Sequence, residues 1–168
     1  MSLRALAVTV SSGVAAGRKP DVSGPLLVEG LRELGLAVDG PSVVADGVPV
    51  EQVLRAAVLA GYDVIVTTGG TGLTPDDLTP EATRAVIDRE VPGIAEAVRA
   101  YGVAHGVPGA VLSRGLAGLA EGTLVVNLAG SPGAVRDGLA VIGPVLHHLL
   151  EQARGRHGHP GDSTAEAP

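Results

Sequence analysis

The sequence contains a glycine-rich run, Gly69-Gly70-Thr71-Gly72, directly after an apolar segment and shortly before a Thr-Pro-Glu sequence typical of a helix start. Because glycine has no side chain, consecutive backbone N–H groups can converge on phosphate oxygens, and a nearby helix start adds partial positive charge. The run lacks the Gly-Lys-Ser/Thr ending of a Walker loop and the spacing of the dinucleotide-binding fingerprint. A tight turn that binds nothing explains the glycines equally well, but the hydroxyl groups of Thr67, Thr68 and Thr71 favour phosphate binding.

Acidic residues accompany this run. A carboxylate beside a phosphate site is electrostatically unfavourable unless a divalent cation lies between them, so Asp77 points to Mg²⁺. The alternative is that Asp76 or Asp77 stabilises the start of the next helix. That alternative is the better explanation for Asp76, whereas chemistry leaves the choice open for Asp77. Asp46 also follows an apolar segment, but Asp46-Gly47 by itself favours an ordinary turn.

A second candidate anion loop is Gly130-Ser131-Pro132, where a hydroxyl group precedes the free N–H groups of a helix start. Taken alone, this loop is better explained as a plain helix start.

The elements that must position these residues alternate between strand and helix. Apolar runs predict strands over residues 3–10, 36–45, 62–68, 110–114 and 123–128. Helical spacing predicts helices over residues 23–34, 50–60, 79 to about 89, from about 92, and from 132, with Thr79 as an N-cap. This alternation predicts an α/β fold with a mostly parallel sheet, in which ligands bind at the carboxyl ends of the strands.

The composition limits the classes of partner. At 168 residues the chain has the size of one domain, with a formal net charge of -6 and no basic cluster longer than Arg18-Lys19, so we expect no nucleic-acid partner. The absence of cysteine excludes a thiol nucleophile and a cysteine-based zinc site. No apolar run approaches the roughly 20 residues that span a bilayer, so we expect a cytoplasmic protein without a membrane partner.

Five motifs occur in a fixed order: Thr67-Thr68-Gly69-Gly70-Thr71-Gly72, Asp77-Leu78-Thr79-Pro80-Glu81-Ala82-Thr83, Pro92-Gly93, Leu112-Ser113-Arg114 and Asn127-Leu128-Ala129-Gly130-Ser131-Pro132. In this order they closely resemble the MogA/MoaB molybdopterin-binding family, from about Ala5 to Leu150. The resemblance implies a three-layer αβα fold with a mostly parallel sheet over residues 1–154. Residues 155–168 are polar, aperiodic and contain Gly and Pro, so their composition predicts a disordered tail. It also implies a homotrimer that adenylylates molybdopterin with ATP and Mg²⁺, releases pyrophosphate, and passes its product to a molybdate-insertion enzyme.

The same resemblance assigns the site. Asp46 and Asp77 match the catalytic acids and are the expected Mg²⁺ ligands. The residues that match the family's substrate-binding positions are Ser11, Asp21, Ser23, Gly24, Thr68, Gly69, Gly70, Thr71, Gly72, Thr79, Glu81, Ser113, Gly130, Ser131 and Pro132.

Two positions depart from the family pattern, and two other functions stay open. Asp76 stands where the family often has Arg, which removes a cation near Asp77, and Ala129 replaces a common Pro. One alternative is a MoaB-like protein that binds the pterin without catalysis. The other is a CinA-like nucleotide pyrophosphatase, which the Gly-Gly-x-Gly-x-x-x-Asp-Asp pattern resembles. The Thr-Pro-Glu, Leu-Ser-Arg and Gly-Ser-Pro motifs favour the molybdopterin branch over the CinA type.

Overall fold

The computed structural model describes residues 2–155, so the expected disordered tail lies outside the described residues apart from Gly155. The strands are β1 (Arg4–Val10), β2 (Ala37–Val44), β3 (Val64–Thr68), β4 (Arg89–Glu90), β5 (Ala117–Ala120) and β6 (Thr123–Leu128). The helices are α1 (Ser12–Ala15), α2 (Ser23–Glu33), α3 (Val48–Leu59), α4 (Thr79–Arg84), α5 (Pro92–Ala104) and α6 (Pro132–Ala153), together with the 3-10 helix η1 (Pro108–Leu112).

The strands form one sheet in the order β2-β1-β3-β6-β5-β4. The first four strands are parallel, with Ala5 beside Val64 and Val64 beside Leu124, whereas β5 and β4 are antiparallel to their neighbours. Parallel neighbours place the carboxyl ends of β1, β2, β3 and β6 at one edge of the sheet. The predicted mostly parallel α/β sheet is confirmed.

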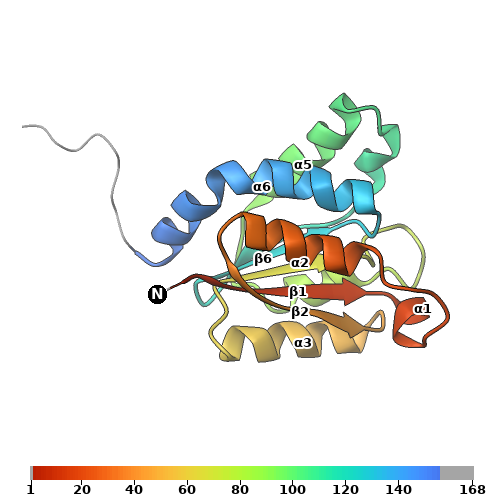
Figure 1. Cartoon of the computed structure of the whole chain (residues 1–168), viewed down its shortest axis with the longest axis horizontal. Coiled ribbons are helices and arrows are strands. Elements are labelled where there is room, and N and C mark those ends of the chain that lie inside the picture. Colours follow the sequence, from red (N-terminus) through yellow and green to blue (C-terminus); the bar gives the residue numbers. More distant parts are fainter. Residues whose placement is uncertain (1, 156–168) are drawn as a thin grey trace, which may run out of the picture.

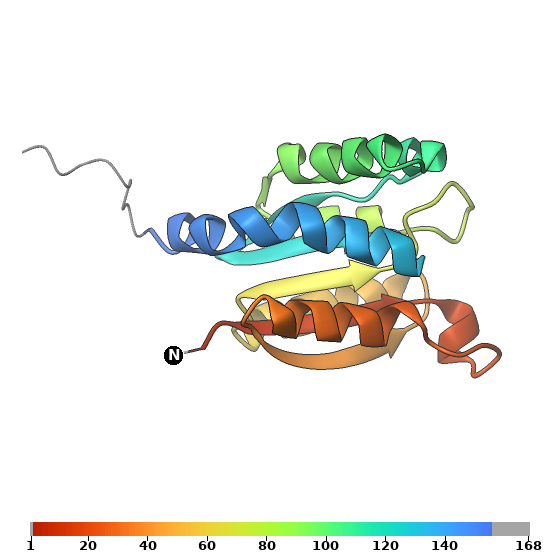
Figure 2. The ribbon, with the colours of Figure 1, turned by 45° about the horizontal axis from the view of Figure 1, so that its top comes forward.

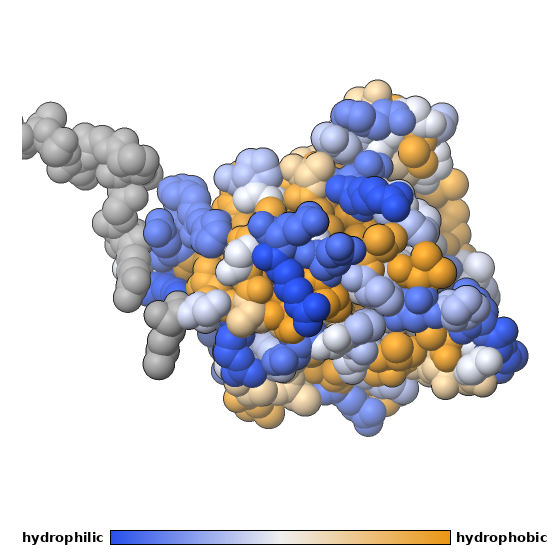
Figure 3. Space-filling view, viewed as in Figure 1, coloured by the Kyte–Doolittle hydropathy of each residue, from blue (hydrophilic) through white to orange (hydrophobic). Residues whose placement is uncertain are grey.

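Helices cover both faces of the sheet. Figure 1 shows α3 on one side and α2 and α6 on the other, and Figure 2 shows α5 beside α6. Among residues 2–155, no helix combines the length and apolar character that a membrane crossing requires. The outer face of α2 and α6 carries hydrophobic residues in small patches between hydrophilic ones (Figure 3).

Aliphatic side chains fill the interior, since the sequence contains neither Phe nor Trp. Every residue of β3 and β6 is buried, and the leucines and isoleucines of α2 and α6 pack on one face of these strands. The other face receives α3. Small residues let α6 lie close to β6, because a Cβ atom on Gly138 would stand 2.4 Å from the side chain of Leu128. This close contact fixes where α6 begins, at the carboxyl end of β6.

The predicted strand at residues 110–114 is wrong, because this segment contains the end of η1 instead. Instead, β5 (Ala117–Ala120) lies beside β6 and pairs with it, and a turn at Glu121 and Gly122 connects the two strands. The side chains of Val111 and Leu112 are exposed, so this apolar segment is not a buried strand.

The predicted helix from Thr79 also ends early, at Arg84 rather than near Arg89. The backbone turns away because Asp88 N–H donates to Leu119 O at 2.8 Å and Val91 N–H donates to Ala117 O at 2.8 Å. Pairing with β5 therefore replaces the last turn of the expected helix.

Candidate functional site

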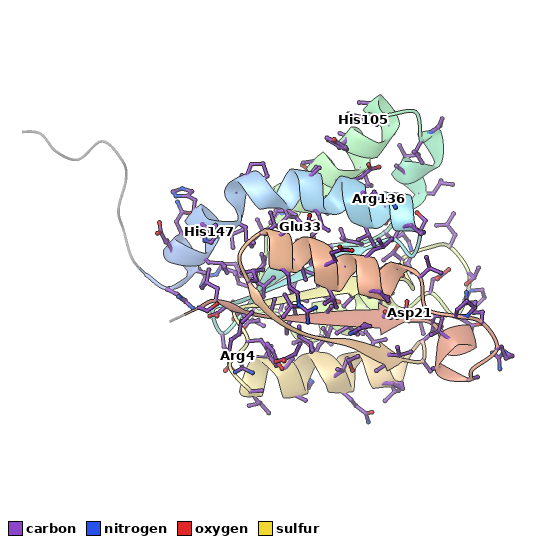
Figure 4. The ribbon with its side chains drawn as sticks, viewed as in Figure 1. Arg4, Asp21, Glu33, His105, Arg136 and His147 are labelled. Atoms are coloured by element: carbon purple, nitrogen blue, oxygen red, sulfur yellow. The ribbon has the colours of Figure 1, made fainter. Side chains whose placement is uncertain are left out.

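A cavity of about 860 Å³ opens at the carboxyl ends of the parallel strands. Figure 4 shows Asp21 at this edge of the sheet and Arg4 at the opposite one. The predicted site residues that line the cavity are Ser11, Asp21, Ser23, Asp46, Thr68, Gly69, Gly70, Thr71, Gly72, Asp77, Ser113, Gly130 and Ser131. The remaining predicted residues, Gly24, Thr79, Glu81 and Pro132, are not part of the lining. Gly24, Thr79 and Pro132 are each bonded or adjacent to a residue that is, whereas Glu81 pairs with Arg114, which lies outside the lining.

The glycine loop takes a conformation that requires glycine. Gly69 and Gly70 have φ angles of 106° and 67°, and a Cβ atom on Gly69 would stand 2.2 Å from Val10 O. Thr79 stabilises the loop through two hydrogen bonds: its backbone N–H donates to Gly70 O at 3.0 Å and its Oγ1 donates to Gly69 O at 3.0 Å. The prediction of Thr79 as an N-cap is wrong for this reason: Leu78 holds the cap position, and the Thr79 hydroxyl is committed to the loop.

The second loop lies against the first. A Cβ atom on Gly130 would stand 3.2 Å from Gly69 Cα, and Thr68 Oγ1 donates to Ala129 O at 3.1 Å. Ser131 is the N-cap of the 22-residue helix α6, and its Oγ accepts the N–H of Ala134 at 3.1 Å. The positive end of a long helix dipole therefore faces the cavity beside the glycine loop, which favours a bound anion.

Asp46 is held by neutral donors. The Ser12 N–H and Oγ donate to Asp46 Oδ2 at 3.0 and 2.7 Å, and Asp46 N–H donates back to Ser12 Oγ at 3.1 Å. The other carboxylate oxygen, Oδ1, lies close to Gly70, because a Cβ atom added to Gly70 would be 3.0 Å from Oδ1. One carboxylate oxygen is thus fixed by the protein while the other faces the glycine loop.

Asp77 occupies the other flank of the glycine loop. Its Oδ2 accepts the N–H and the Oγ1 of Thr74 at 3.0 and 2.7 Å, and it would touch a Cβ atom on Gly72 at 2.7 Å. The hydrogen bond from the Thr74 hydroxyl is the main reason that the pKa of Asp77 lies below its ordinary value, with the charge of Arg114 contributing less. Asp77 is therefore a carboxylate at neutral pH.

These loops have counterparts in known proteins. A model of the probable molybdopterin binding domain matches residues 6–148 of the chain. The chain belongs to this family. It is 38% identical over 151 residues to the molybdopterin adenylyltransferase of Pyrococcus furiosus. The matched region covers 88% of this chain and 89% of that protein. It is similar in structure to the molybdopterin biosynthesis Mog protein from Mycobacterium ulcerans, with 47% identity, a TM-score of 0.86, and coverage of 90% of this chain and 99% of that one. The molybdopterin biosynthesis enzyme MoaB from Thermus thermophilus is 42% identical to this chain, with a TM-score of 0.84. That match covers 91% of this chain and 97% of the MoaB chain. The resemblance to MogA/MoaB proteins is confirmed.

In this chain, Arg114 holds the segment from Gly72 to Asp77 in place through hydrogen bonds, a role that the sequence did not reveal. Its Nε donates to Gly72 O at 2.8 Å, its guanidinium also bonds Asp77 O, and it forms an ion pair with Glu81. The hydrogen bond from Arg114 lowers the pKa of Glu81, and Glu81 in turn raises the pKa of Arg114. Its place in the Leu-Ser-Arg motif was the available signal. Glu81 therefore supports the glycine loop through Arg114.

Asn127 is a second residue that the sequence did not single out. Its amide donates to Thr67 Oγ1 at 3.1 Å and to Thr83 Oγ1 at 2.9 Å, and its side-chain oxygen accepts Leu116 N–H at 3.3 Å. It is buried, and every one of these bonds joins different elements. Asn127 thereby fixes the end of β6 against β3 and α4, directly beneath the two loops.

Three further residues of the cavity wall were also not anticipated: Lys19, Arg99 and Asp137. Lys19 is the one lysine of the chain and stands two residues before Asp21, which accepts Thr9 Oγ1 at 2.7 Å. Arg99 donates to Ser113 O at 3.3 Å and to Gly115 O at 3.0 Å. Lys19 and Arg99 bring positive charge to a wall that otherwise carries carboxylates.

The carboxylates are compatible with Mg²⁺ that is shared with a substrate. Within residues 2–155, no group of three or more His, Asp and Glu side chains forms a metal cluster of its own. Mg²⁺ is commonly bound by one or two carboxylates together with substrate phosphates, and it keeps several water ligands. Asp46 and Asp77, on the two flanks of the glycine loop, have the donor type and number for that arrangement.

Proposed function

We propose that this chain is a molybdopterin adenylyltransferase: it transfers the adenylyl group of ATP to the terminal phosphate of molybdopterin and releases pyrophosphate. The observation that carries the proposal is that the glycine loop and the loop at the start of α6 meet Asp46 and Asp77 in one cavity. The curated relative from Pyrococcus furiosus, of similar length, bears the name of this activity. Two adjoining loops suit a reaction between two phosphate groups better than either loop alone.

In the proposed reaction, an oxygen of the molybdopterin phosphate attacks the α-phosphorus of ATP. The bond from the α-phosphorus to the bridging oxygen of the β-phosphate breaks, and that oxygen leaves with pyrophosphate. The substrate is the nucleophile, so the protein has to align two phosphates and offset their charge rather than supply a nucleophile. The glycine loop and the start of α6 hold the phosphates through backbone N–H groups, while Lys19 and Arg99 add positive charge.

Asp46 and Asp77 are the residues that we propose would hold Mg²⁺. The ion, when bound, would neutralise charge on the phosphates as a Lewis acid. Ser12 and Thr74 direct one oxygen of each carboxylate, and the low pKa of Asp77 keeps that side chain charged.

The same proposal includes a homotrimer that works in the cytoplasm and delivers its product to a molybdate-insertion enzyme. Exposed apolar residues of α5 and η1 that lie outside the cavity lining support a contact surface for other copies of the chain: Val103 and Val111. Equilibrium sedimentation of the purified protein tests the trimer.

The deciding experiment incubates the purified chain with molybdopterin, ATP and Mg²⁺ and assays pyrophosphate and adenylylated pterin. We expect both products in equal amounts, and none without ATP. Binding of molybdopterin without either product would replace the proposal by the MoaB-like binding protein. Release of nucleotide monophosphates from dinucleotides, with no molybdopterin present, would replace it by the CinA-like hydrolase.

A further inference from the structure

The cavity extends beyond the two phosphate loops into a recess between α5, η1 and α6. On α5 the residues of the wall are Ala95, Val98, Arg99 and Gly102. Ala95, Val98 and Gly102 share one face of the helix because of their spacing. A Cβ atom on Gly102 would stand 2.7 Å from the Ala110 Cβ of η1 and 3.7 Å from Asp137 Oδ2 of α6. The three elements therefore pack closely at this point, and the cavity of about 860 Å³ that they border has room for a flat ring.

Two charged residues, Arg99 and Asp137, stand in this wall among small apolar side chains. Arg99 donates its hydrogen bonds to the carbonyl oxygens of Ser113 and Gly115. Asp137 is partly buried, and within residues 2–155 its carboxylate has neither a hydrogen bond nor an ion pair. Asp46 and Asp77, by contrast, each have a serine or threonine as donor. A carboxylate without a donor in a partly buried wall is costly, and it repels any phosphate that comes near. The group of a ligand that faces Asp137 must therefore donate hydrogen bonds.

We propose that Asp137 binds the amino-bearing edge of the pterin ring of molybdopterin, an inference that rests on the proposed function. That edge presents two adjacent donors, the 2-amino group and N3–H, which match the two acceptor oxygens of a carboxylate. Adenine presents one donor beside an acceptor nitrogen, so it would leave one carboxylate oxygen facing a lone pair. Asp137 thus selects the pterin and keeps the nucleotide base out of the recess.

The position of Asp137 on α6 agrees with this assignment. The start of the same helix, at Ser131 and Gly133, faces the phosphate end of the cavity. Asp137 is four residues after Gly133, on the same face and about 6 Å further along the axis. One helix therefore presents partial positive charge to the phosphate and a carboxylate to the ring, and it orients the substrate from both ends.

The variant Asp137→Asn tests the proposal with almost no change of shape. Asparagine offers one acceptor and one donor, so one donor of the pterin edge would face another donor. We expect the Kd of molybdopterin, measured by its own fluorescence, to rise about tenfold or more, the factor for losing a hydrogen bond to a charged group. The Kd of ATP, measured by calorimetry, should stay unchanged. Glu151→Gln removes the same charge from an exposed position of α6 outside the cavity and should change neither constant.

A pair of ring probes gives a second readout in the unmutated protein. 6-Hydroxymethylpterin should bind more tightly than 6-hydroxymethyllumazine, which has an oxygen in place of the 2-amino group, and Asp137→Asn should abolish this preference. If Asp137→Asn binds molybdopterin as tightly as the unmutated chain, or if it tightens ATP alone, the assignment is wrong. In either case an unmutated chain that still forms adenylylated pterin would leave the proposed function intact, and only the role of Asp137 would fall.

Discussion

The two ends of the sheet use charged residues in opposite ways. At the amino ends of the strands, Asp63 accepts the backbone N–H of Arg4 at 2.7 Å and pairs with Arg154, and Arg4 also stands 4.4 Å from the centre of the Tyr62 ring. Tyr62 donates to Asp39 at 2.6 Å, and this hydrogen bond is the main reason that the pKa of Tyr62 is raised. Positive and negative groups at this end satisfy one another.

At the carboxyl ends, the carboxylates of Asp46 and Asp77 receive hydrogen bonds from Ser12 and Thr74, and Asp137 has no partner within the described residues. The cationic side chain closest to the glycine loop, Arg114, bonds carbonyl oxygens and Glu81. Negative charge is therefore left for a ligand at this end. The difference teaches that ion pairs at one edge stabilise the fold, whereas carboxylates held by neutral donors at the other edge are available for binding and chemistry.

The largest effect is expected when Asp46 and Asp77, the two carboxylates that are held by neutral donors, are substituted. Asp46→Asn and Asp77→Asn should each lower the turnover of adenylylated pterin on the order of 10²-fold or more, because charge stabilisation worth several kcal/mol is lost. The thermal unfolding midpoint should hardly move. Asp76→Asn, which alters an exposed neighbour outside the cavity, is the matched control and should keep its turnover. Full turnover in both catalytic variants would show that these carboxylates are only structural.

Arg114 is the exception at the functional end, because this charged group is fully paired within the protein. Its removal should affect activity by displacing Asp77 and not by removing a contact with substrate. We expect Arg114→Ala to lower kcat about tenfold with a smaller change in KM, since the loop that carries Asp77 loses its hydrogen bonds to Gly72 O and Asp77 O. Arg114→Lys should restore only part of kcat, because a single ammonium group cannot replace the forked contacts. Arg84→Ala on the exposed side of α4 is the control. A drop in kcat of the same size in Arg84→Ala would contradict the role of Arg114.

The donor to Asp77 predicts a change in pH dependence. Thr74 lowers the pKa of Asp77, so Thr74→Val should raise that pKa and shift the acid side of the kcat/KM profile to higher pH. The folded-state pKa is below the unfolded one, so this carboxylate adds stability above its unfolded pKa and loses it as pH falls through the folded value. In Thr74→Val this contribution should be smaller, and its loss should be complete at higher pH. Thr74→Ser keeps the hydroxyl and should retain the original profile, and an unshifted Thr74→Val profile would show that Asp77 does not control it.

The smallest expected effect concerns the opposite end. Asp63→Asn should lower the free energy of unfolding by about 1 kcal/mol, because weaker acceptors replace the charged partner of Arg4 N–H and Arg154. Turnover should remain unchanged. Denaturant unfolding measures the first quantity and the product assay the second, with Glu29→Gln on the surface of α2 as a control. Loss of turnover without loss of stability would mean that the two ends do not divide their roles in this way.

Local sequence was sufficient for much of the fold. The β-branched run of β3 and the apolar run of β6 were predicted with nearly the observed bounds, as was the glycine loop that follows β3. The strand Ala117–Ala120 was missed because alanine, glycine and leucine carry little strand preference. Its one local signal is the turn at Glu121 and Gly122, whose φ angles are 50° and 88°. Pairing with β6 across that turn, rather than composition, makes this segment a strand.

The sequence by itself determined most of the strands and helices, β1, β3, β6 and α2 among them, and the glycine-rich loop after β3, because periodicity and glycine content act over a few residues. Only the tertiary structure decided that Arg114 holds a loop whose residues lie 37 positions and more away, and that Asp137 lies next to Gly102 in the cavity wall. Such contacts depend on how α5 and α6 pack on the sheet. Their energy comes from burial and hydrogen bonds between distant segments, for which no local pattern exists.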